Sequence, residues 1–117
     1  PRVVEDQVGR LSFTTDLAAA TTHLLHTGAP YGTYDVTSTG DPASWADLAR
    51  AVFELTGHDP DRVIPVSTAP YTAGAAGPVA PRPPRSVLDL DRIQETGFQP
   101  TDQMAALTAY LQGRTNR

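Results

Sequence analysis

The sequence predicts a small α/β domain of short strands and about four helices. Two observations lead to this class. Short runs rich in β-branched residues alternate with segments whose apolar residues recur at helical spacing, a rhythm that favours strands joined by helical crossovers. Hydrophobic residues make up 39% of the 117 residues and charged residues 19%, a balance typical of a globular chain with one modest core.

The first elements follow from this pattern. Residues 1–9, PRVVEDQVG, predict a short strand that runs into a loop. A helix then begins with Thr14 or Thr15 as its cap, with Asp16 in its first turn, and Gly28 ends it. The apolar spacing places Leu17, Ala20, Thr21, Leu24 and Leu25 on its inner face.

A second strand, helix and strand follow. Residues 32–37, GTYDVT, alternate as a strand does. Ser44 and Asp47 form a capping box that begins the next helix, and Gly57 ends it. Its helical spacing predicts a buried stripe of Trp45, Leu48, Ala49, Val52 and Phe53. Residues 62–67 then predict an edge strand, because they contain a proline.

The last part of the chain begins with a long loop. Residues 68–81 lack periodicity and are rich in Pro, Gly and Ala, which is typical of mobile or functional loops. Residues 86–89 predict a very short strand, and a small helix runs from there to Gly97. The final helix starts at Thr101 or Asp102, with Met104, Leu107 and Leu111 on its inner face.

Composition argues against several functions. A net charge of −4 is unsuited to a general nucleic-acid binder, and no apolar run is long enough to cross a membrane. The absence of cysteine excludes disulfides and fits a cytoplasmic location. All nine basic residues are arginines, so these residues contain no catalytic or phosphate-binding lysine. Because the chain opens directly on a strand, we expect it to start in mid-domain.

Three patterns receive a structural interpretation. His23 and His26 lie three apart on the first helix, but no HExxH motif or cysteine accompanies them, so no metal site is expected. Trp45 is interpreted as core because its apolar neighbours recur at helical spacing. The adjacent carboxylates Glu5 and Asp6 point to opposite faces of a strand and form a poor acid/base pair.

The basic, proline-rich segment 78–86, PVAPRPPRS, admits two interpretations. Arg82 lies between Pro81 and Pro83, which hold the backbone extended, so it loses little entropy on binding. Its guanidinium matches phosphate oxygens in pairs, and Arg85 adds a second set of donors. An anion clamp and a solvated linker fit the segment equally well on these grounds.

Six motifs in order resemble a known family: VVEDQVGR, TTDLAAA, GTYDVTSTG, SWADLARAVFELTG, RVIPVSTAPY and APRPPRSVLDLDRIQETG. Along nearly the whole chain they are similar to the C-terminal part of the dTDP-4-dehydrorhamnose reductases, which are extended short-chain dehydrogenases/reductases of Rossmann type. The resemblance implies an NADPH-dependent oxidoreductase that makes dTDP-L-rhamnose for bacterial cell-wall polysaccharide. It implies that residues 1–117 are one C-terminal substrate-binding domain, inactive alone. NADPH and a Tyr-x-x-x-Lys pair would belong to an N-terminal Rossmann domain.

The resemblance also assigns substrate-binding residues. Gln7 and Gly9 match the family's Gln-x-Gly at the edge of the substrate cleft, where glycine lets backbone approach the ligand. Arg82 matches the arginine that reaches the pyrophosphate in related sugar-nucleotide enzymes, with Arg85 as a weaker candidate. Ser86 matches the Ser-x-Leu that follows. No catalytic, cofactor-binding or metal-binding residue is expected on this chain.

Two other functions stay open. One is a non-catalytic nucleotide-sugar-binding or interaction module, and the other is the substrate domain of a related sugar-nucleotide epimerase or dehydratase. The expected partners are a dTDP-sugar and the Rossmann domain, with no nucleic acid or membrane. Without that domain the helix face of Leu17 and Leu24 and the strand edge at 33–37 would be bare, so we expect the isolated chain to self-associate.

Overall fold

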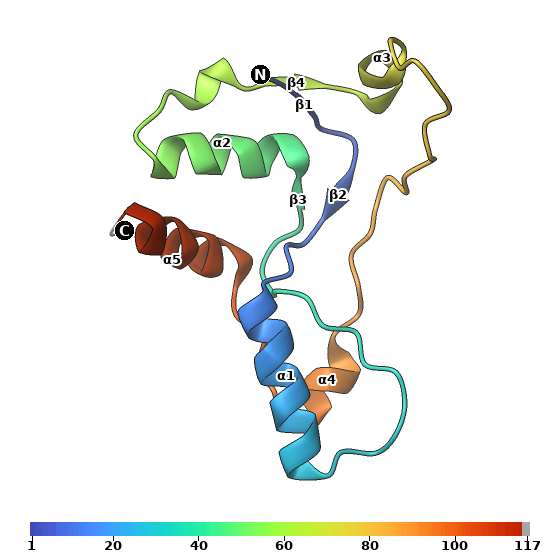
Figure 1. The fold of residues 1–117 in the computed structure, drawn as a ribbon, viewed down its shortest axis with the longest axis vertical. Helices are drawn as coiled ribbons and strands as arrows, with labels where there is room; N and C mark the ends of the chain where they lie inside the picture. Colours follow the sequence, from blue (N-terminus) through green and yellow to red (C-terminus); the bar gives the residue numbers. More distant parts are fainter. Residues whose placement is uncertain (116–117) are drawn as a thin grey trace. The chain divides into compact units, whose positions relative to one another are not determined.

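The computed structural model of this chain describes residues 1–115, which group into two compact units (Figure 1). The first unit combines residues 1–9 with residues 42–87. The second combines residues 10–41 with the segment from Leu88 on. Each unit is therefore built from two separate stretches of the chain.

A parallel strand pair with a helical crossover organises the first unit. β1 pairs in parallel with β4, with Val3 opposite Pro65, and α2 packs against β1 between them in sequence (Figure 1). Among residues 1–115, β4 pairs with β1 alone, in agreement with the edge position expected for a strand that contains proline. The elements are β1 (Arg2–Val4), β2 (Val8–Gly9), β3 (Ala43–Ser44), α2 (Trp45–Leu55), the 3-10 helix η1 (Pro60–Arg62), β4 (Ile64–Val66) and α3 (Thr68–Thr72).

The predicted capping box begins α2. Ser44 Oγ accepts a hydrogen bond from Asp47 N at 3.1 Å, and Asp47 Oδ2 accepts one from Ser44 N at 3.0 Å. Ser44 Oγ also donates to Asp47 Oδ2 at 2.7 Å, and this bond, followed by the one from Ser44 N, lowers the pKa of the Asp47 carboxyl below its ordinary value. Leu48 is buried as predicted, but Trp45 is 55% exposed, so its assignment to the core is wrong. At the first helical position a side chain points toward the N-terminus, where no preceding turn covers it.

Helices and one small cluster form the second unit. Its helices are α1 (Thr14–Thr27), α4 (Asp91–Glu95) and α5 (Gln103–Thr115). Ala20, Leu90 and Ile93 are its buried centre, with Leu24 packed against them. Ala20 and Leu24 therefore lie on the inner face of α1 as predicted, whereas Leu25 does not. Gly28 ends α1 in the left-handed conformation, with φ of 61°, as the sequence indicates.

The start of α1 differs from the prediction. Phe13 occupies the cap position, and no side chain caps the helix, so neither Thr14 nor Thr15 is its cap. Asp16 is in the first turn as predicted, and its carboxylate accepts hydrogen bonds from Thr101 N at 3.2 Å and Thr101 Oγ1 at 2.9 Å. The acidic residue of the first turn thus joins α1 to the segment before α5.

The α/β class is confirmed, but three further local predictions are wrong. Residues 32–37 form no strand, because no neighbouring segment among residues 1–115 pairs with them. Residues 86–89 form none either, and only a single parallel bridge joins Arg85 to Val8. The segment 68–81, predicted as loop, begins with the short helix α3 and brings the α-helices of the described chain to five.

Candidate functional site

The candidate site is a cavity of about 460 Å³ in the first unit. Its fixed wall comes from β1, from Gln7 after it, and from Trp45 at the start of α2. The opposite wall comes from α3 and from the proline-rich segment behind it, including Arg82. We call residues 68–86 the strap; beyond α3 it runs without helix or strand (Figure 1).

Aromatic and cationic side chains share the cavity. Trp45 and Tyr71 supply the rings, Arg2 and Arg82 supply the positive charge, and none of the described lining residues is Asp or Glu. Arg82 makes no ion pair or hydrogen bond with another side chain of residues 1–115. An uncompensated guanidinium beside aromatic and aliphatic surface suits a ligand that has a planar ring and an anionic group.

A hydrogen-bond relay ties the strap to the fixed wall. Thr68 N donates to Asp6 Oδ2 at 2.9 Å, and Thr68 Oγ1 donates to Asp6 Oδ1 at 2.6 Å. Gln7 Nε2 donates to Thr68 Oγ1 at 3.0 Å. Hydrogen bonds from Thr68 lower the pKa of the Asp6 carboxyl. Asp6 therefore supplies the cap that α3 lacks from its own preceding residue.

The C-terminal end of the strap is bound to the backbone of Val8, the residue that follows Gln7. Val8 N donates to Pro84 O at 2.8 Å, and Ser86 N donates to Val8 O at 2.8 Å. Both ends of the strap are thus bound to residues 6–8.

The structure brings the predicted site residues together in two groups. Gln7 and Arg82 line the cavity. Gly9 and Ser86 meet at the end of the strap, where a Cβ on Gly9 would lie 2.8 Å from Ser86 Oγ. Because Gly9 has no side chain, Ser86 of the strap can lie directly against its backbone. Arg85 lies at this junction through its bridge to Val8, and it does not line the cavity.

Sequence reasoning missed three residues of this site. Trp45 was assigned to the core, although its position directly after the capping Ser44 indicates an outward side chain. Tyr71 falls within the predicted loop 68–81, but it lies on α3. The sequence alone relates Asp6 only to its neighbour Glu5, with which it forms a poor acid/base pair. Its actual partner is 62 positions away, so no local pattern could reveal it.

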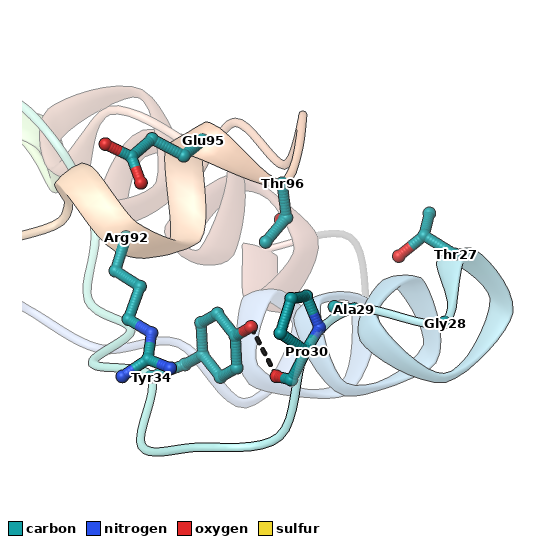
Figure 2. A pocket seen from close by; sticks show the side chains of 8 residues that line it. All are labelled: Thr27, Gly28, Ala29, Pro30, Tyr34, Arg92, Glu95 and Thr96. Atoms are coloured by element: carbon teal, nitrogen blue, oxygen red, sulfur yellow. Dashed lines mark hydrogen bonds between the residues drawn. The ribbon is translucent and has the colours of Figure 1, made fainter.

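A second cavity of about 420 Å³ lies in the second unit, between the ends of α1 and α4. Figure 2 shows Arg92 reaching from α4 to Tyr34, whose hydroxyl donates to Pro30 O at 2.7 Å. The Arg92 guanidinium carbon lies 4.7 Å from the centre of the Tyr34 ring, and Nη2 donates to Tyr31 O at 3.3 Å. Arg92 is therefore committed to its own unit, and we assign no ligand to this cavity.

Within residues 1–115 no group of three or more His, Asp or Glu side chains is arranged to hold a metal ion. None of the helices in that range combines the length and apolar character that crossing a membrane requires.

Comparison with known proteins places the chain in context. The family model described as the RmlD substrate binding domain matches residues 2–116. The spore coat polysaccharide biosynthesis protein SpsK of Bacillus subtilis (strain 168) is 37% identical over 115 residues, which are 98% of this chain and 38% of that protein. A dTDP-4-dehydrorhamnose reductase of Streptomyces griseus is 40% identical over 111 residues, which are 91% of this chain and 34% of that protein.

Solved structures agree with these relatives. A dTDP-4-dehydrorhamnose reductase ortholog of Clostridium acetobutylicum matches with a TM-score of 0.84 and 31% identity, over 98% of this chain and 39% of that chain. The enzyme of Bacillus anthracis in complex with NADP matches with a TM-score of 0.76 and 32% identity, over 94% of this chain and 36% of that chain. The chain thus spans about a third of the length of the proteins it matches.

Proposed function

Because this chain belongs to the RmlD substrate binding domain family, we propose that it holds the sugar nucleotide of an NADPH-dependent dTDP-4-dehydrorhamnose reductase. The substrate is dTDP-4-dehydro-L-rhamnose, and the product is dTDP-L-rhamnose. An N-terminal Rossmann domain, outside these residues, binds NADPH and carries the Tyr-x-x-x-Lys pair. The reaction takes place in the cytoplasm, where NADPH and the substrate occur together.

The observation that carries this proposal is the composition of the cavity. Arg82 and Arg2 offer donors for a pyrophosphate, while Trp45 and Tyr71 offer surfaces for a planar base, and no carboxylate of the described lining opposes the anion. Such a combination suits a nucleoside diphosphate better than a simple sugar or an apolar ligand.

In the proposed reaction the residues of this chain bind and orient. NADPH supplies a hydride to C4 of the keto sugar, and the tyrosine of the other domain gives a proton to the oxygen, so the carbonyl becomes a hydroxyl. Arg82, Arg2 and the rings contact the nucleotide, which is remote from C4. Their binding energy fixes the sugar in position for that transfer.

Titration of the full-length protein tests this function. We expect dTDP-sugars to bind more tightly than the UDP- and GDP-sugars, and we expect dTDP-4-dehydro-L-rhamnose to be reduced with NADPH. Calorimetry measures the first, and loss of NADPH absorbance measures the second. Preference for UDP, or binding of the sugar nucleotide without reduction, would support the epimerase, dehydratase or non-catalytic alternatives.

A second candidate substrate comes from one relative. A protein named dTDP-4-keto-6-deoxy-D-glucose reductase from Streptomyces niveus is 43% identical over 98 residues, 84% of this chain. The substrate in that name differs from dTDP-4-dehydro-L-rhamnose only in its sugar. The nucleotide contacts proposed above would therefore serve either substrate. Identification of the product sugar by nuclear magnetic resonance distinguishes them.

A further inference from the structure

We propose that Asp6, which does not line the cavity, fixes the hydrogen-bonding direction of Gln7, so that the site selects a nucleobase with a ring N–H. This inference rests on the proposed binding of a sugar nucleotide and adds to it a basis for base selectivity. Asp6 is in this sense a positioning residue, because it acts through Thr68 and Gln7.

The direction of the relay follows from the chemistry of its members. An ionised carboxylate only accepts hydrogen bonds, so the hydroxyl hydrogen of Thr68 is committed to Asp6 Oδ1, 2.6 Å away. The remaining lone pairs of Thr68 Oγ1 can only accept. The amide group of Gln7 that faces Thr68 must therefore be its NH2, in agreement with the 3.0 Å bond from Nε2.

The other end of the Gln7 amide is then an acceptor. Gln7 is half-buried and lines the cavity, and its Oε1 has no hydrogen-bond partner within residues 1–115. A ligand that covers this oxygen must offer it a donor, because a polar atom that is buried without a partner is costly.

The surroundings of Gln7 indicate which part of the ligand it meets. Val3, Val4 and Trp45 line the cavity on the same fixed wall, and a flat, largely apolar base fits this surface. The phosphates are satisfied by the arginines instead. Thymine, uracil and guanine carry a ring N–H that can donate to Oε1, whereas the corresponding ring nitrogen of cytosine or adenine accepts.

One isosteric change removes the fixed direction of the relay. In Asp6→Asn the side chain keeps an oxygen for Thr68 N and presents an NH2 group to Thr68 Oγ1. The hydroxyl of Thr68 is then free either to donate to Gln7 or to accept from it, so the Gln7 amide can present either its oxygen or its NH2 to the ligand. The size of the site is unchanged, and only the fixed direction of its hydrogen bonds is lost.

The experiment is calorimetric titration of the full-length protein with dTDP and with dCDP. We expect the wild type to favour dTDP by about tenfold, the scale of one mispaired hydrogen bond. We expect Asp6→Asn to bring the two affinities within about twofold or to invert their order. The matched control Asp61→Asn removes a carboxylate in the same unit that makes no side-chain hydrogen bond among the described residues, and it keeps the tenfold ratio.

The outcomes separate the inference from the proposed function. If the wild type binds neither nucleotide, the proposed function fails. If it binds both equally, or if Asp6→Asn weakens both by the same factor, the function stands and the role of Asp6 in selectivity is overturned. Should Asp6→Asn not fold, Gln7→Leu removes the acceptor directly; loss of the tenfold ratio supports the inference, and retention of it overturns the inference.

Discussion

The position of Arg82 distinguishes it from the other arginine of the strap. It lies between two prolines, lines the cavity and has no side-chain partner among residues 1–115. Arg85 is three residues away in the same strap but lies outside the lining. Two arginines that look equivalent in the sequence are therefore placed differently by the fold.

We expect Arg82→Ala to weaken dTDP binding by about 1.5–3 kcal/mol, or roughly ten- to a hundredfold, because a charge-assisted hydrogen bond to the phosphate is lost. Arg85→Ala is the matched control and should stay within about twofold of the wild type. Calorimetric titration of the full-length protein measures both. Equal losses in the two variants would contradict the placement of Arg82 as the clamp.

At the residue scale, the sequence predicts the role of a residue when that role depends on its direct neighbours in the chain. Arg82 is recognisable because the prolines that stiffen it are its direct neighbours. Asp6 is not recognisable, since the threonine that defines its role is far away in the chain. Gly9 is predictable as a position of close approach, but the sequence does not indicate that the strap, through Ser86, is what approaches it.

The helices differ in how they begin, and this has a measurable consequence. We expect Ser44→Ala to lower the free energy of unfolding by about 1 kcal/mol, because Asp47 N loses Ser44 Oγ as its acceptor, while the bond from the backbone N of residue 44 to Asp47 remains. Thr14→Ala, at the start of α1 where no side chain caps, should change it little. Chemical denaturation measures both variants, and an equal loss in the two would contradict the capping assignment.

The same box gives the chain a pH dependence at acid pH. The pKa of Asp47 is lowered in the folded state from its ordinary value of 3.8, mainly by the hydrogen bond from the Ser44 side chain. Its stabilisation is therefore complete above about pH 4 and is lost as pH falls through the lower, folded pKa. We expect the melting temperature of the Asp47→Asn variant to fall less steeply between pH 5 and pH 2 than that of the wild type. Identical slopes would refute this origin.

At the element scale, the outcome depends on where each element finds its partners. The capping box of α2 is contained within four residues, so the pattern predicts it. α3 needs a carboxylate from another segment at its first turn, and no local pattern contains one. Apolar and polar side chains alternate along residues 33–37, as they do in a strand. Alternation places the apolar side chains on one face, but a strand also requires hydrogen bonds to the backbone of a neighbouring segment.

At the scale of the whole molecule, apolar side chains of the second unit remain uncovered. Leu17 is 41% exposed, Leu25 77% and Tyr110 51%. Large apolar side chains left bare tend to be covered by another copy or another domain. We expect residues 1–117 produced alone to self-associate and to show no NADPH oxidation with dTDP-4-dehydro-L-rhamnose. Multi-angle light scattering and absorbance measure these properties.

The double substitution Leu17→Gln and Leu25→Gln should shift the isolated chain toward monomer, because it removes the apolar part of this surface. Ile64→Gln, at an exposed isoleucine of the first unit, is the matched control and should leave the assembly unchanged. A monodisperse monomer for the unmodified chain would contradict the expectation. Turnover by the isolated chain would contradict the placement of the catalytic groups elsewhere.

The order of motifs along the chain indicates the family because it samples the whole fold. Each motif alone is weak, and VVEDQVGR or SWADLARAVFELTG would fit many α/β proteins. The division of residues 1–115 into two interleaved units is not visible in that order, since it depends on which distant segments pack together. The chemistry of the cavity is visible only in part, through Gln7 and Arg82.

The anchoring of the strap at residues 6–8 also makes it a place where the protein can be lengthened. Both ends are fixed by hydrogen bonds, whereas a side chain added at Gly74 or Gly77 would meet nothing within 4 Å. Extra residues at this tip cost only the slowly growing entropy of a longer loop. A short peptide tag or a fluorescent label could therefore be inserted between Gly74 and Gly77, and it would report on ligand binding from a position next to the cavity.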